Sequence, residues 1–362
     1  MALFETIFDL SYLILVIGFG IRLLLVEEKG AKLFGLMAIL LGAGDAFHLI
    51  PRIVSHLGEG GFEANAWALS WGQFVTSITM TVFYLLFYIY YKRQTSRGTR
   101  AKDLTVYILV LLRILLTVLP QNQWGTMPGN YTFGILRNIP FAALGLLLII
   151  WSWEERKTEG MEHMATLIFF SFLFYAPVVL FAQAYPWVGA FMMPKTVAYL
   201  LLVYAGFKNY IREFRKQTVL ELAMVNLILG LAGGVFYREF TKIFGFSGTT
   251  ALGKVHVHVL GLGFLSLVVL YMLIRGKEEE FMRKLRTPVY LWLGGLFVTT
   301  VMMLIRGITE VLGGYLGNMP EAAISGLAGM GHMILSIGIV LVTVLMIREE
   351  RKPCSTQITT SL

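Results

Sequence analysis

The stretch GKVHVHVLGLGFLSLVVLYMLI, residues 253–274, decides the fold class of this chain. It has the length and the apolar composition of a transmembrane helix, which needs about 20 predominantly apolar residues. Two histidines, His256 and His258, lie at its start. A polar ring in hydrocarbon needs a partner, so these histidines are also the first candidate functional residues.

Apolar runs of this kind recur along the whole chain. Of its 362 residues, 57% are hydrophobic and 14% are charged. Runs of about 20 apolar residues between polar breaks predict an all-α, polytopic integral membrane protein with about eleven transmembrane helices. The first run has acids and no basic segment before it, so we expect a retained span and not a cleaved signal. The predicted spans are 7–26, 33–54, 67–91, 104–119, 132–152, 164–184, 191–207, 218–240, 254–274, 288–312 and 323–347.

Basic residues are unevenly divided between the connections. The segments that follow odd-numbered spans hold 21 of the 30 Lys and Arg residues, whereas the alternate connections hold only Lys242. If the span boundaries are moved so that Arg52 and Lys254 fall in the alternate connections, these connections hold three basic residues and not one. The positive-inside rule therefore predicts an outside N-terminus and a cytoplasmic C-terminus. This topology signal accounts for most of the net charge of +8, so we expect no nucleic-acid partner.

The basic link FKNYIREFRKQ, residues 207–217, is the best candidate boundary in the chain. It separates a seven-span domain, residues 1–210, from a four-span domain, residues 218–347, which a cytoplasmic tail, residues 348–362, follows. The single cysteine, Cys354, lies in this tail and excludes an intrachain disulfide framework and a cysteine-based zinc site. The chain has no Walker A motif and no dinucleotide fingerprint, so direct use of ATP or NAD is not indicated.

Polar residues inside the spans gather in the half that the topology places outside. Charges in a bilayer usually face a bundle interior or a wet cavity, so this distribution predicts an externally accessible site or pair of sites. Two of these residues, Arg306 and Glu310, are four apart on one helical face and can neutralise each other. The candidates for the polar pocket are Asp45, His48, Arg52, Arg137, Lys195, Arg306 and Glu310.

Three histidines of the four-span domain are the candidate cofactor ligands. His256 and His258 differ by about 200° in direction, so a regular helix cannot aim both at one metal ion. His332 lies in the same leaflet as His258 on a helix of the same direction, which permits an axial pair across a haem. In this interpretation His256 supports the haem or faces a second site. Alternatively, the histidines form hydrogen bonds with Glu310, Glu239 or backbone groups and organise the bundle.

The same segment carries resemblances to known families. HVHVLGLGF, residues 256–264, resembles the H-x-H-x-x-x-x-G segment of haem-copper oxidase subunit I and of small relatives whose histidines hold haem. The oxidase pattern also requires copper-binding histidines on other helices, which this domain lacks, so oxygen reduction at a binuclear centre is disfavoured. With LAGGVFYREFTKIFGFSGTTALGK, IRGITEVLG and ISGLAGMGHMI, nearly all of 218–347 resembles a short bacterial four-helix membrane family of unknown function.

The seven-span domain contains LLGAGDAFHLIPRI, PQNQWGTMPGNYTFGILRNIP and MMPKTVAYLLLVYAGF, and with these stretches it resembles an uncharacterised bacterial membrane family. Both bacterial resemblances imply the cytoplasmic membrane as the location. LLGAGDAFHLIPRI, residues 40–53, places Asp45, His48 and Arg52 at three- and four-residue steps along one face. Such a stripe can couple an acid, an imidazole and a cation, although Pro51 can kink the helix. Arg52, Arg137 and Lys195 predict a pocket for an anion or a lipid headgroup.

Two functional hypotheses follow from these patterns. The first is a cytochrome-b-like redox or sensing protein in which His258 and His332 hold haem b and which exchanges electrons with a redox partner. The second is a transporter or binding protein that admits a small anionic or protonatable solute to the outward-facing polar pocket. Both hypotheses place the protein in the lipid bilayer.

Overall fold

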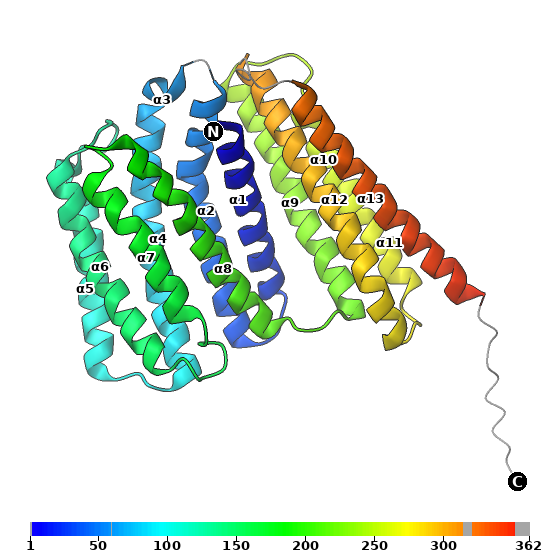
Figure 1. The fold of residues 1–362 in the computed structure, drawn as a ribbon, viewed down its shortest axis with the longest axis horizontal. Helices are drawn as coiled ribbons and strands as arrows, with labels where there is room; N and C mark the ends of the chain where they lie inside the picture. The colour runs from blue at the N-terminus through cyan, green and yellow to red at the C-terminus, as the bar shows by residue number, and fades with distance from the viewer. Residues whose placement is uncertain (1, 59, 314–320, 352–362) are drawn as a thin grey trace, which may run out of the picture. The chain divides into compact units, whose positions relative to one another are not determined.

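The computed structural model describes residues 2–58, 60–313 and 321–351, and every regular element in these ranges is a helix (Figure 1). Two compact units share the chain. The first contains α1 to α8 and the last residues of α12 from Ile308, and the second contains α9 to α11, the rest of α12, and α13. Residues 352–362 of the predicted tail, which include Cys354, lie outside the described residues.

The first unit is a ring of long helices in which each packs on the next and α8 returns to α1 (Figure 1). Its centre is aromatic, because α4 buries the rings of Tyr84, Tyr88 and Tyr91 completely. The elements are α1 (Ala2–Leu24), α2 (Lys29–Leu57), α3 (Gly61–Ala64), α4 (Ala66–Thr95), α5 (Arg100–Val118), η1 (Pro120–Asn122), α6 (Tyr131–Glu154), α7 (Met164–Phe181), η2 (Pro186–Phe191) and α8 (Met192–Tyr210).

The second unit is a bundle built on α9, the interrupted α10–η3–α11 span, α12 and α13. The backbones of α12 and α13 approach closely at glycines, since a Cβ added to Gly295 would lie 2.2 Å from the Leu335 nitrogen. Small residues permit such contacts between membrane helices. The elements are α9 (Lys216–Ile243), α10 (Leu252–His258), the π-helical η3 (Val259–Leu265), α11 (Ser266–Leu273), α12 (Glu279–Leu312) and α13 (Glu321–Glu350).

The all-α, membrane-spanning fold that the sequence predicts is confirmed. Within the described ranges, 10 helices are long and apolar enough to cross a bilayer, against the eleven predicted. The difference is the predicted span 104–119, which corresponds to α5. This helix carries Lys102, Asp103 and Arg113 within its 19 residues, and this charge distinguishes it from the ten apolar helices.

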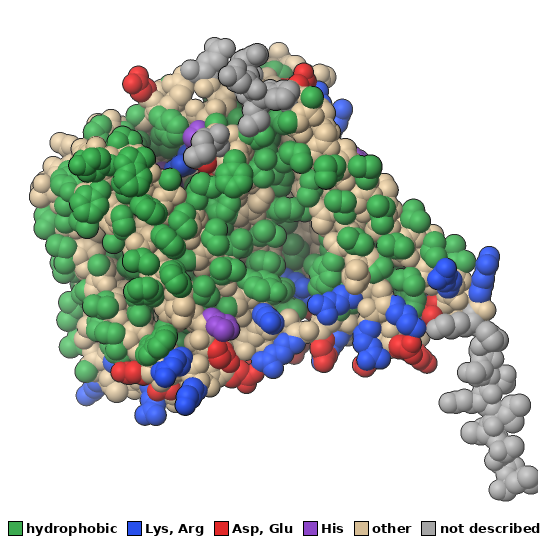
Figure 2. All heavy atoms as spheres, viewed as in Figure 1, with side chains coloured by type: hydrophobic (Ala, Val, Ile, Leu, Met, Phe, Trp, Pro, Cys, Tyr) green, Lys and Arg blue, Asp and Glu red, His purple; other side chains and the backbone are tan. Residues whose placement is uncertain are grey.

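Charged side chains gather at one end of each unit, and the rest of the visible face is mainly hydrophobic (Figure 2). In the first unit this end carries the α1–α2, α4–α5 and α6–α7 connections. In the second unit it carries the start of α9 and the α11–α12 connection. An apolar surface with charged ends is what a lipid bilayer environment requires. The direction of insertion stays a prediction.

Candidate functional site

His258 and His332 lie side by side in the second unit. His258 ends α10 and His332 lies in α13, and their ring centroids are 6.1 Å apart with perpendicular planes. Each Nδ1 donates to a carbonyl of its own helix, that of Lys254 for His258 and that of Ala328 for His332, both at 2.9 Å. Because a carbonyl only accepts, Nδ1 carries a proton in both rings, and Nε2 has no hydrogen-bond partner among the described residues.

The backbone around the pair is irregular and rich in glycine. The π-helical η3 begins directly after His258, and the Ser266 hydroxyl donates to the Gly261 carbonyl at 2.8 Å. π-helical turns occur frequently at functional sites. Gly261 and Gly329 each lie three residues from a histidine of the pair, and a Cβ added to either would meet no atom within 4 Å. The helix surfaces next to the two rings are therefore open.

His256 faces a different neighbour from His258. Its ring stacks on Tyr237 of α9, with centroids 6.2 Å apart and an interplanar angle of 15°. Its Nδ1 is buried and has no hydrogen-bond partner among the described residues. The two histidines therefore do not converge on one point. Elsewhere in this unit, Arg306 forms an ion pair with Glu321 at 3.4 Å. Glu310 lies one turn further along α12, in the part of that helix that belongs to the first unit.

In the first unit, polar side chains meet along the contact between α1 and α2. The Tyr12 hydroxyl donates to the Asp45 carboxylate at 2.6 Å, and Arg52 forms an ion pair with Glu5 at 2.7 Å. The Nδ1 of His48 is buried and has no partner in the described part of the chain. The predicted stripe of Asp45, His48 and Arg52 is therefore divided, since its acid and its cation each bind a group on α1.

The acids and the tyrosine of α1 are site residues that the sequence interpretation missed. Glu5, Asp9 and Tyr12 are four and three residues apart, so they share one face of α1. Asp9 is 6% exposed, and its Oδ2 has no hydrogen-bond partner among the residues described. The signal that could have found them is polar residues recurring with helical spacing in an otherwise apolar span.

Lys195 and Arg137 are held by neutral groups. The Lys195 ammonium lies 4.5 Å from the centroid of the Tyr175 ring, and the side chain is 9% exposed. Arg137 donates to the Asn122 side-chain oxygen at 2.9 Å. Because Arg52 is paired with Glu5, the three cations predicted to line one pocket have separate partners.

Arg113 is a further buried cation to which the sequence interpretation gave no role. It is 2% exposed, donates to the Asn138 side-chain oxygen at 2.9 Å and to the carbonyl of Arg137, and lies over the ring of Phe141. The Tyr175 hydroxyl donates to the same Asn138 oxygen at 3.1 Å. One hydrogen-bonded group thus joins α5, α6 and α7.

Comparison with known proteins identifies part of the chain. Residues 216–349 match the model of a family described as a protein of unknown function (DUF2871), so the rear part carries a domain of that family. This finding agrees with the predicted resemblance of residues 218–347 to a family of unknown function. The resemblances of the seven-span part and of the H-x-H segment stay predictions.

A curated relative matches a part of the chain. NADH-quinone oxidoreductase subunit N of Chloroflexus aggregans (strain MD-66 / DSM 9485) is 29% identical over 182 residues, which cover 47% of this chain. The matched region is 35% of the relative, so the chain spans about a third of that protein's length. No solved structure matches the chain.

Proposed function

We propose that the second unit binds haem b between His258 and His332 and that the protein is a cytochrome-b-like redox or sensing protein of the bacterial cytoplasmic membrane. The spacing of the two rings is the observation that carries this proposal. Two imidazoles that hold one metal ion from opposite sides, each through a bond of about 2 Å, have centroids roughly 6 Å apart. The centroids of His258 and His332 are 6.1 Å apart.

The hydrogen bonds of the pair fit metal ligation. A ligating histidine commonly donates its other ring N–H to a carbonyl or carboxylate, which fixes the tautomer and orients the ring. The Nδ1 atoms of His258 and His332 donate in this way to the carbonyls of Lys254 and Ala328. This arrangement leaves Nε2 as the atom of each ring that would bind the metal ion.

The ligand set favours haem over a bare ion. The described residues hold no group of three or more His, Cys, Asp or Glu side chains that could bind a metal ion. Haem needs only two axial ligands because the porphyrin supplies four nitrogens, and it would provide one-electron or gas-binding chemistry. Gly261 and Gly329 leave the surface beside the rings clear for a flat macrocycle, and the exposed Lys254 is the nearest cation in sequence for a propionate.

The comparisons give limited support to a redox role. The name of the relative is that of a subunit of a quinone-dependent oxidoreductase, and its match covers less than half of this chain. A redox partner for this protein is therefore part of the proposal.

An absorbance spectrum of the purified protein, oxidised and reduced, tests the proposal. We expect a Soret band and reduced α and β bands that are lost in His258→Ala and in His332→Ala. His256→Phe is the matched control, because it removes the neighbouring imidazole, which stacks on Tyr237, and we expect it to retain the spectrum. A colourless, folded protein from haem-replete cells would contradict the proposal.

A second candidate function is the binding or transport of a small anionic or protonatable solute by the first unit. It is favoured by Asp9 and Lys195, which are buried in the spans. Within the described residues, Asp9 Oδ2 has no hydrogen-bond partner and the Lys195 ammonium contacts only aromatic rings. Unsatisfied ionisable groups in a membrane mark ion or solute pathways. Thermal stabilisation by a panel of small carboxylates and phosphate, lost in Lys195→Met, would favour this function.

A further inference from the structure

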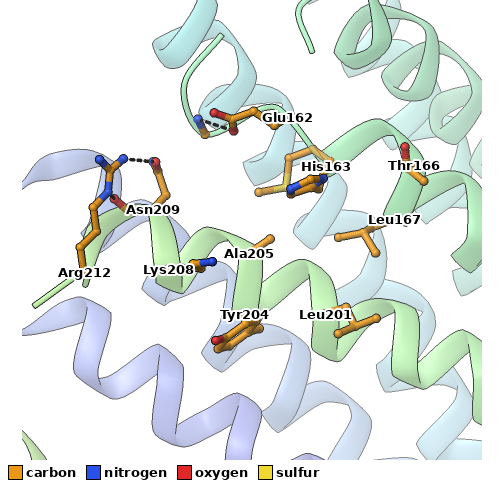
Figure 3. A pocket seen from close by; sticks show the side chains of 12 residues that line it. Glu162, His163, Thr166, Leu167, Leu201, Tyr204, Ala205, Lys208, Asn209 and Arg212 are labelled. Carbon is orange, nitrogen blue, oxygen red and sulfur yellow. Dashed lines mark hydrogen bonds between the residues drawn. The ribbon is translucent and has the colours of Figure 1, made fainter. Parts of the chain in front are cut away.

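A cavity of about 550 Å³ opens between α7 and α8 of the first unit, next to the α6–α7 connection (Figure 3). Leu201, Tyr204, Ala205 and Lys208 line it from one face of α8, because they are spaced three, one and three residues apart. Leu167 of α7 lies on the opposite wall. The cavity is separate from the histidine pair and from the polar residues between α1 and α2.

The lining changes from apolar to basic along α8. Leu201 and Tyr204 are 46% and 47% exposed, so the apolar end faces the surroundings of the helices. Lys208 lies two turns beyond Leu201, which is about 10 Å along the helix axis. It lies in the last turn of α8, at the end of the unit where charged side chains gather.

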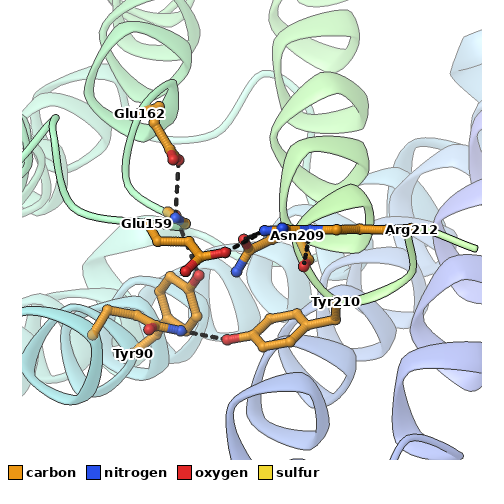
Figure 4. Close-up of polar contacts among 8 residues, drawn as sticks. Tyr90, Glu159, Glu162, Asn209, Tyr210 and Arg212 are labelled. Carbon is orange, nitrogen blue, oxygen red and sulfur yellow. Dashed lines mark hydrogen bonds and ion pairs between the residues drawn. The ribbon is translucent and has the colours of Figure 1, made fainter.

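The residues at the polar rim of the cavity bond to one another, and Lys208 takes no part in these contacts. Arg212 forms an ion pair with Glu159, and the Glu162 carboxylate accepts the Gly160 N–H at 2.9 Å (Figure 4). The Tyr90 hydroxyl donates to the Gly160 carbonyl at 3.2 Å and fixes the same connection to α4. Lys208 has no hydrogen bond or ion pair within the described ranges, and its ammonium lines the cavity opposite His163 (Figure 3).

From this geometry we infer that the cavity between α7 and α8 binds an anionic phospholipid, with the phosphate at Lys208 and an acyl chain against Leu201, Tyr204 and Leu167. The lining carries two cations, Lys208 and Arg212, of which Arg212 is paired with Glu159. It carries one carboxylate, Glu162, which is already bonded to Gly160. The Asn209 side chain accepts from Arg212 through its oxygen, and its amide N–H groups are further donors for a phosphate.

A lipid fits this cavity better than free phosphate does. A phospholipid in a bilayer has its headgroup at the interface and its acyl chain deeper, in the same order as Lys208 and Leu201 along α8. Free phosphate would use the basic end and leave the apolar end unfilled. Basic pockets between membrane helices at the cytoplasmic side are known to bind lipid headgroups.

Lipid binding to the delipidated full-length protein in detergent tests the inference. Native mass spectrometry would give the affinities for phosphatidylglycerol and phosphatidylcholine, and thermal unfolding would follow stabilisation by each lipid. We expect tighter binding of phosphatidylglycerol. Lys208→Gln should weaken that binding about fivefold, the factor that corresponds to about 1 kcal/mol for one basic side chain near an anionic lipid.

Two further variants distinguish binding of the lipid headgroup from binding of the acyl chain. Ala205→Phe fills the apolar end, so we expect it to abolish binding of both lipids while the unfolding temperature without lipid is kept. Lys157→Gln is the matched control, because Lys157 is exposed on the adjacent connection and does not line the cavity. We expect Lys157→Gln to bind phosphatidylglycerol as the wild type does.

Several outcomes would overturn the inference. Equal affinity for the two lipids, or wild-type affinity in Lys208→Gln, would show that the cavity does not recognise an anionic headgroup. Wild-type binding by a folded Ala205→Phe protein would place the lipid elsewhere. Stabilisation by glycerol phosphate equal to that by phosphatidylglycerol would assign the cavity to a small soluble anion. Because Lys208 and Ala205 belong to the first unit, none of these outcomes bears on the haem proposal.

Discussion

Two adjacent glycines of α12 should respond in opposite directions to the same substitution. A Cβ added to Gly295 would lie 2.2 Å from the backbone nitrogen of Leu335 and 2.6 Å from the carbonyl oxygen of Gly331, both in α13. A Cβ added to Gly294 would meet nothing within 4 Å. Gly295→Ala therefore tests the contact between α12 and α13, and Gly294→Ala is its matched control.

The magnitude follows from the two environments. Because the atoms near Gly295 belong to the backbone, α12 and α13 must separate by about 1 Å, and overpacking of this kind costs about 1–3 kcal/mol. Alanine in a helix gains about 0.5–1 kcal/mol over glycine at either position. We expect Gly294→Ala to be slightly more stable than the wild type and Gly295→Ala to be less stable. The two variants should differ by roughly 2 kcal/mol.

Unfolding of the purified protein in mixed micelles, titrated with SDS and followed by circular dichroism, measures this difference. Gly331 directly precedes His332, so the same displacement should also weaken haem binding in Gly295→Ala and leave it intact in Gly294→Ala. Equal stability of the two variants, or greater stability of Gly295→Ala, would refute the close backbone contact between α12 and α13.

Three other predictions concern the histidine pair, the first unit and the topology. Gly261→Leu should abolish the haem spectrum and keep the unfolding transition, because it fills open space beside His258. Tyr12→Phe should destabilise the protein by about 2 kcal/mol, since it removes the donor to a charged acceptor, Asp45, and Tyr107→Phe, on an exposed ring, should not. A membrane-impermeant maleimide should label Cys354 in inside-out vesicles and not in intact spheroplasts, because the C-terminus is predicted to be cytoplasmic.

Most of the fold could be predicted from hydropathy, because only helices with satisfied backbones can present such long apolar runs to a bilayer. The exception was α5. Its apolar run was correctly recognised as a helix, but Lys102, Asp103 and Arg113 lie within its length. Arg113 is satisfied by Asn138 and by the carbonyl of Arg137, both on α6, and a contact between helices leaves no mark on a hydropathy profile.

The candidate sites were predictable to different degrees. His258 and His332 could be matched in depth, because helix direction and the rise per residue fix how far each lies from the helix end. The pairing of α1 with α2 could not be predicted, because it depends on the rotation of each helix about its own axis. The sequence predicts that Asp45 and Arg52 act together, yet the rotation of α1 presents Tyr12 to Asp45 and Glu5 to Arg52.

The proposed haem ligands differ from the Tyr12–Asp45 pair of the first unit in how their side chains are bonded. In the first unit, Tyr12 bonds Asp45 across two helices, so the fold itself uses both groups. Within the described part of the second unit, His258 and His332 bond only to carbonyls of their own helices, a contact that an isolated helix also provides. Tertiary packing brings the ring centroids to 6.1 Å, and neither Nε2 has a hydrogen-bond partner among the residues that the structure describes. Polar atoms without partners are costly in hydrocarbon, and the haem that we propose would satisfy both Nε2 atoms at once.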